Sequence, residues 1–163
     1  RALLRISNIE SGKRHSEFGT ASVSEIVEDI FEFYEPLAEE KQVELKTEIE
    51  EVNLNCDRDL LFQAIANLVD NAIKFSPANS NVKIRLSKAS GRVLISVSDQ
   101  GEGVSDEDKN KIFDRFYRAE KSRNSAGNGL GLSLVAAIIE LHAGQIELSD
   151  NNPGLRVKVS LPL

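Results

Sequence analysis

The chain has 163 residues, of which 40% are hydrophobic and 28% are charged, values typical of one soluble domain with a core of its own. No run approaches the roughly 20 apolar residues of a membrane helix, and a net charge of −6 argues against nucleic acid as the main partner. Cys56 is the only cysteine, which excludes an intrachain disulfide and a thiolate metal cluster and favours a reducing, cytoplasmic setting.

The first residues carry apolar side chains near helical spacing and then a stop at Ser11-Gly12, which predicts the tail of a helix that begins upstream. The chain contains no Met and begins with Arg1, so we expect it to be a piece of a longer protein. A short strand is predicted over 17–22, and a strongly amphipathic helix follows over 23–37.

The rest of the chain predicts six strands and two helices. The strands are expected over 43–49, 52–56, 82–86, 92–99, 145–149 and 155–161, and the helices over about 57–75 and 129–142. The first two of these strands are expected to be joined by a tight turn, Asp57 to cap the first helix, and Gly144 to stop the second. The 82–99 pair and the last pair are antiparallel because their connections are short. These features predict a mixed, mostly antiparallel sheet with three main helices on one face, rather than a doubly wound parallel sheet.

Two amides and one ammonium share a face of the helix predicted over 57–75. Asn67, Asn71 and Lys74 are spaced i, i+4, i+7. Asn is a mediocre helix former, so two of them one turn apart need a reason. An amide oxygen can ligate Mg²⁺ without placing negative charge beside a polyphosphate. The alternative is a solvated polar face.

A carboxylate continues the apolar face of the strand over 92–99. Val93, Ile95 and Val97 alternate along it, and Asp99 has the same parity, so its side chain is expected to point inward. A buried carboxylate needs a donor. The exocyclic amine of adenine is one candidate, and a plain turn capped by Asp is the alternative. The glycines of the Asp99–Gly103 segment would let backbone approach a flat ring closely.

A glycine-rich segment, 127–131, opens the last helix, where free N–H groups attract phosphate. Neither a dinucleotide-binding nor a phosphate-loop motif fits it, and a flexible loop is the alternative. The preceding stretch, 109–123, has six basic residues against two acids, which indicates either an anion site or a solvated charged helix. Within it, Phe113 and Phe116 could anchor the stretch to the core while Arg118 faces phosphates.

Four segments in this order resemble the boxes of two-component sensor histidine kinases: NLVDNAIKFS, DQGEGV, IFDRFYR and GNGLGLSLV. The resemblance covers about 22–163 and implies the Bergerat fold, an α/β sandwich that holds ATP between sheet and helices under a mobile lid. It further implies that 1–15 is the end of a dimerisation helix with its linker, and that 16–163 is the catalytic domain.

Carried over residue by residue, the resemblance implies that Asn71 coordinates Mg²⁺ with Asn67 nearby, and that Lys74 and Arg118 meet the phosphates of ATP. Asn67, Lys74 and Arg118 are assigned to catalysis on this basis. Phe75 lies where the family often has an aromatic residue against the nucleotide.

For the base and the lid, the resemblance implies that Asp99 accepts the adenine amine, with Gly101 and Gly103 beside the ring. Lid and nucleotide contacts are assigned to Gly127, Gly129, Leu130, Gly131 and Leu132. The sequence LHAG at 141–144 resembles the family's L-H-G-G, and Ala143 in place of Gly is expected to have little consequence.

Two departures from related classes decide the predicted reaction. Gyrase-like and mismatch-repair ATPases have a Glu four residues before the Mg²⁺-binding Asn, where it activates water; Asn67 stands there in this chain, which favours phosphoryl transfer. No segment matches the family's phosphoacceptor box, and His15 and His142 are expected to be structural. The implied partners are the protein's own dimerisation domain, in a homodimer, and a response regulator. The domain is expected to be cytoplasmic, with no membrane contact of its own, in a parent protein anchored in the inner membrane. The alternative is a module that binds ATP without transfer.

Overall fold

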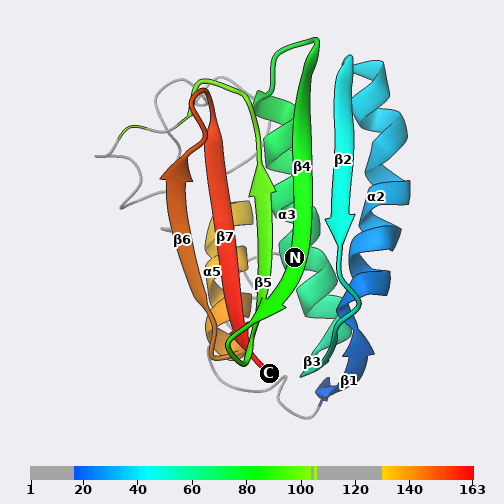
Figure 1. Ribbon diagram of the computed structural model, residues 1–163, viewed down its shortest axis with the longest axis vertical. Coiled ribbons are helices and arrows are strands. Elements are labelled where there is room, and N and C mark those ends of the chain that lie inside the picture. Colours follow the sequence, from blue (N-terminus) through cyan, green and yellow to red (C-terminus); the bar gives the residue numbers. More distant parts are fainter. Residues whose placement is uncertain (1–16, 104, 106–129) are drawn as a thin grey trace.

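The computed structural model describes residues 17–103, 105 and 130–163, which form one mixed sheet, one small ribbon and three helices. The helices are α2 (Val23–Glu40), α3 (Arg58–Phe75) and α5 (Leu130–Leu141). The strands are β1 (Gly19–Ser22), β2 (Val43–Ile49), β3 (Asn53–Cys56), β4 (Ser80–Ala89), β5 (Arg92–Ser98), β6 (Gln145–Asp150) and β7 (Leu155–Pro162). In Figure 1 the three helices lie behind the sheet, so the described chain forms two layers. The predicted α/β sandwich is confirmed.

The main sheet has the order β2-β4-β5-β7-β6, and only the β2–β4 pair is parallel. The two antiparallel pairs predicted from short connections, β4–β5 and β6–β7, are confirmed. The β2–β4 pair is parallel because α3 supplies the long crossover that such a pair needs.

The tight turn predicted between β2 and β3 is wrong, because the two strands belong to different sheets. β3 pairs antiparallel with β1 in the two-stranded ribbon. The connection bends around the start of α2 instead: Ser24 Oγ donates to Glu50 O at 3.2 Å and accepts from Val52 N at 2.9 Å. The carbonyl of Glu50 and the N–H of Val52 are therefore satisfied by the hydroxyl of Ser24 and not by each other.

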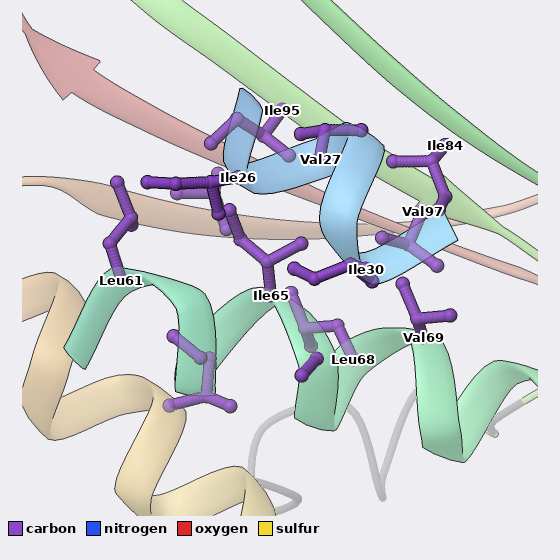
Figure 2. Packing of buried hydrophobic residues seen from close by; sticks show 14 of the residues in the cluster. Ile26, Val27, Ile30, Leu61, Ile65, Leu68, Val69, Ile84, Ile95 and Val97 are labelled. Carbon is purple, nitrogen blue, oxygen red and sulfur yellow. The ribbon is translucent and has the colours of Figure 1, made fainter. Parts of the chain in front are cut away.

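The core lies between the sheet and the helices, where the helices' apolar stripes meet the inward side chains of the strands. Figure 2 shows Ile26 and Ile30 of α2 and Ile65 of α3 beneath Ile84 and Ile95 of the sheet. These five side chains are all at most 1% exposed. Each buried aliphatic side chain contributes roughly 1.5–3 kcal/mol of transfer free energy. The core therefore fixes the apolar face of α3 and leaves the polar face of that helix outside the core.

Side-chain and backbone caps set the helix ends. Asp57 is the N-cap of α3 and accepts from Leu60 N at 3.1 Å, as predicted. The end of α5 differs from the prediction: Ala143, not Gly144, has the left-handed backbone, with φ of 57°. Ala143 N donates to Glu140 O and Gly144 N to Ile139 O, both at 2.9 Å, which is the Schellman pattern with Ala143 at C′.

His142 ties the end of α5 to the start of α3. Its Nδ1 lies 2.7 Å from Ile138 O, a pure acceptor, so Nδ1 carries the proton and Nε2 accepts from Asp57 N at 3.1 Å. The ring is buried and stacks on Phe18 with 4.7 Å between centroids. His142 therefore has the structural place expected of it, whereas His15 lies outside the described residues.

Candidate functional site

The site is built around the carboxyl group of Asp99, which follows β5 and is only 9% exposed. Its side chain continues the inward face of the strand, as the alternation predicted. Oδ1 accepts from Gly101 N at 3.0 Å and from Leu155 N at 3.1 Å. No described residue donates a hydrogen bond to Oδ2, so one carboxylate oxygen is held by the backbone and the other is left for a ligand.

Burial controls the protonation of this carboxyl group. Desolvation raises the pKa of Asp99 above its ordinary 3.8, and the hydrogen bonds from Gly101 and Leu155 oppose that rise because they favour the carboxylate. These two backbone N–H groups compensate for the burial of the inward carboxylate; one comes from the loop after Asp99 and the other from the first residue of β7.

The loop after Asp99 is fixed to two other elements. Gln100 Oε1 accepts from Asn81 N, at the start of β4, at 2.8 Å. A Cβ on Gly101 would overlap the carbonyl oxygen of Phe75 and lie 3.3 Å from its carbonyl carbon. Gly101 is therefore required for the close approach of this loop to the end of α3. The sequence had predicted that this glycine allows a close approach to a ligand ring. Gly103 has φ of +79°, so its backbone favours glycine for conformational reasons.

The same close approach brings the last residue of α3 to the Asp99 loop, and the predicted polar face lies on this helix. Asn67 and Asn71 are half-buried, one helical turn apart, and no described residue hydrogen-bonds to either side chain. Lys74 and Phe75 are exposed in the last turn, Phe75 to 46%. Half-buried amides that have no partner among the described residues are suited to a polar ligand or a hydrated cation.

Lys41 contributes to this end of α3 and has no signal in the sequence. Its ammonium donates to the carbonyl oxygens of Ile73, at 2.7 Å, of Lys74, and of Ser76, at 3.3 Å. Desolvation and then the Lys74 charge lower the pKa of Lys41. The last carbonyls of α3 are thus capped by a cation that follows a different helix.

The turn between β6 and β7 is the second feature that the sequence did not indicate as part of the site. Asn151 Nδ2 donates to the backbone carbonyl of Asp99 at 2.7 Å. Gly154, with φ of +110°, packs so closely that a Cβ there would lie 2.9 Å from Asp99 Oδ1 and 2.6 Å from its carbonyl carbon. The sequence Asn151-Asn152-Pro153-Gly154 predicted only a turn, because its partner lies about fifty residues away.

The remaining predicted site residues are only partly placed. Arg118, Gly127 and Gly129 lie outside the described residues. Leu130 and Gly131 open α5, and the half-buried Leu132 packs against the hydrophobic core. No group of three or more His, Cys, Asp or Glu side chains able to hold a metal occurs in the described ranges.

In the described part of the chain, the α/β sandwich thus has a loop carboxylate with one oxygen that accepts no hydrogen bond, and two amides on α3 that form none, which are features suited to a nucleotide-binding domain. Residues 56–163 match the family model described as "Histidine kinase-, DNA gyrase B-, and HSP90-like ATPase", and the chain belongs to that family.

Two curated relatives are sensor proteins by their names. The chain is 34% identical over 155 residues to the heme sensor protein HssS of Staphylococcus saprophyticus, covering 94% of this chain and 33% of that protein. It is 33% identical over 164 residues to the sensor-like histidine kinase SenX3 of Mycolicibacterium smegmatis, covering 98% and 43%. The chain thus spans less than half the length of these relatives. Among solved structures, the catalytic domain of the histidine kinase ThkA superposes with a TM-score of 0.80 at 28% identity, covering 90% of this chain and 95% of that one. None of the helices in the described ranges is long and apolar enough to cross a membrane.

Proposed function

We propose that this domain binds Mg-ATP and transfers the γ-phosphate to a histidine on a dimerisation domain of the same protein, from which it passes to an aspartate on a response regulator. The observation that carries the nucleotide assignment is the carboxyl group of Asp99. Its Oδ1 is committed to two backbone donors, whereas its Oδ2 has no described donor.

Adenine fits this carboxylate because its exocyclic amine supplies the missing donor. Guanine presents a carbonyl oxygen at the same ring position, which would face the carboxylate oxygen and leave both acceptors unsatisfied. The backbone donors keep the side chain in place before the base arrives, so little ordering is lost on binding.

The triphosphate would extend from the base along α3. We infer that Asn71 holds the Mg²⁺ that accompanies ATP, with Asn67 nearby, and that Lys74 and Arg118 neutralise phosphate charge. The neutral amides fit a cation that takes most of its other ligands from phosphates and water. When bound, Mg²⁺ neutralises charge on the transferring phosphoryl group. Gly127, Gly129, Leu130, Gly131 and Leu132 are proposed to contact the nucleotide as the lid.

Phosphoryl transfer is favoured over hydrolysis because the helix has an amide where a general base would activate water. The side chain of Asn67 cannot remove a proton from water. In the transfer, the bond from the γ-phosphorus to the β,γ-bridging oxygen breaks, a bond to an imidazole nitrogen forms, and ADP leaves with the electron pair. The residues of this domain supply positioning and charge neutralisation.

Asp99→Asn tests the adenine assignment. The asparagine Oδ1 can still accept from both backbone N–H groups, but Nδ2 then points a donor at the adenine amine. Titration calorimetry should show ATP affinity lower by roughly one to two orders of magnitude, the size of a lost charged hydrogen bond. Affinity for purine riboside triphosphate, which lacks the amine, should be nearly unchanged. Equal ATP affinity in both proteins would remove the assignment.

The transfer step requires a second protein. The domain incubated with labelled ATP and a histidine-bearing dimerisation domain should transfer the label in a Mg²⁺-dependent manner, and Asn71→Ala should abolish it. Nucleotide binding without any transfer would favour the alternative, a module that only binds ATP. We further propose that the domain works in the cytoplasm and that its parent is a homodimer anchored in the inner membrane.

A further inference from the structure

We propose that Asn151 and Arg156 are positioning residues that fix the carboxyl group of Asp99 for adenine, an inference that rests on the proposed function. Neither residue needs to touch the nucleotide. They act through a chain of hydrogen bonds that begins on the open face of the sheet and ends at the Asp99 backbone.

Arg156 determines how the amide of Asn151 is oriented. Its Nη2 lies 3.1 Å from Asn151 Oδ1, and its Nε donates to Ser98 Oγ at 3.2 Å. A guanidinium has only donors, so the amide must turn its oxygen toward Arg156. The amide NH₂ group is then left facing the carbonyl oxygen of Asp99, 2.7 Å away.

The opposite orientation of the amide would place two oxygens against each other at the Asp99 carbonyl. Without Arg156, no described residue on the Oδ1 side of the Asn151 amide favours the orientation in which Nδ2 donates to the carbonyl oxygen of Asp99.

The turn and the first residue of β7 together hold Asp99 at three points. Asn151 binds its carbonyl oxygen, Leu155 N binds Oδ1, and Leu155 O accepts from Asp99 N at 3.0 Å. With its backbone and Oδ1 fixed, the direction of Oδ2 is fixed as well. The fit of a carboxylate oxygen to a ring amine depends on that direction, since hydrogen bonds weaken steeply away from linearity.

The test uses two nucleotides that differ only in the amine. Calorimetric dissociation constants for ATP and for purine riboside triphosphate are measured for the parent domain and for Asn151→Ala, Asn151→Asp and Arg156→Met. Each variant should bind ATP about threefold to tenfold more weakly, with affinity for purine riboside triphosphate within about twofold. Arg156→Met should add nothing in the Asn151→Ala background, because Arg156 acts through that amide.

Arg92→Met is the matched control. Arg92 lies at the far end of the same strand pair and binds Ser160 in the way that Arg156 binds Ser98. It should leave the ratio of the two affinities unchanged, and thermal melting of all variants reports any general loss of stability.

Equal weakening of both nucleotides, or full additivity of the Asn151 and Arg156 substitutions, would overturn the positioning role. If Asp99→Asn changes the affinity ratio and the Asn151 and Arg156 variants do not, the positioning role alone fails. If Asp99→Asn itself leaves the ratio unchanged, the adenine assignment fails and the positioning role fails with it.

Discussion

Replacing Ala143 by Gly should stabilise the domain, and replacing the adjacent Gly144 by Ala should destabilise it. Ala143 occupies the C′ position of α5 with φ of 57°, where the side chain crowds the backbone. Gly144 has an ordinary backbone, but a Cβ there would lie 2.5 Å from Leu161 Cδ2, 2.7 Å from Ser160 O and 2.9 Å from Ile139 Cγ2. Neighbouring positions thus respond with opposite signs.

The size of each effect follows from the local geometry. A left-handed conformation costs an L-residue roughly 1–2 kcal/mol, and glycine returns roughly 0.5–1 kcal/mol of that as lost chain entropy on folding. Ala143→Gly should therefore raise the free energy of unfolding by about 0.5–1 kcal/mol, or Tm by about 1–4 °C. Ser160 O belongs to the backbone of β7, and Leu161 and Ile139 are at most 1% exposed, so Gly144→Ala should cost about 1–3 kcal/mol.

Thermal and urea unfolding followed by circular dichroism measure both changes without nucleotide. An unchanged m-value, the dependence of the free energy of unfolding on urea concentration, would show that the stability has changed and not the compactness of the unfolded state. A neutral or destabilising Ala143→Gly would contradict the strain at Ala143 and would support the expectation that Ala143 has little consequence. A tolerated Gly144→Ala would contradict the crowding around Gly144.

Three further predictions concern pH, the cysteine and the loop glycine. The folded state raises the pKa of Asp99 above 3.8, so folding favours the protonated carboxyl group. The stability that this group contributes is therefore present below pH 3.8 and is lost as the pH rises through the raised pKa. ATP needs the carboxylate, so calorimetry should show the ratio of ATP affinity to purine riboside triphosphate affinity falling as pH drops through that raised value, and a ratio insensitive to acid would contradict this. Burial raises the pKa of Cys56 to about 11 and leaves the residue 1% exposed, so a thiol reagent at pH 8 should label it only as the domain unfolds; labelling of the native protein at the rate of a free thiol would show the burial to be wrong. Gly101→Ala should lower Tm and weaken ATP binding because its Cβ would overlap the carbonyl of Phe75, whereas Gly19→Ala, with open space around it, should do neither, and equal Tm values for the two variants would exclude the overlap.

The sequence indicates most of the fold because the apolar periodicities have one interpretation each. The alternation of Val93, Ile95 and Val97 predicts β5 and the inward direction of Asp99, and both are found. Pairing partners are a different matter. β2 and β3 are adjacent in sequence but belong to different sheets, because long-range contacts rather than local propensity select a strand's neighbour.

The site shows the same division between local and distant information. The amides of α3 and the carboxyl of Asp99 are visible as motifs, because each is defined within one segment. The groups that contact Asp99 come from a turn that the sequence marks only by its composition, with Asn151 and Gly154, and from Leu155 at the start of β7. Backbone donors also carry no side-chain signature, so the compensation of a buried carboxylate could not be read from residue types.

The ammonium of Lys41 changes the electric field in which an anion would approach this domain. The unpaired carbonyls at the end of a helix carry the equivalent of about half a negative charge, and α3 ends where Lys74 and Phe75 lie. Lys41 binds the carbonyls of Ile73 and Lys74 in the last turn and that of Ser76 after it, and so places a positive charge against that helix end. Lys41 can therefore influence how strongly the association rate of a polyanion depends on ionic strength, although it does not itself contact the nucleotide.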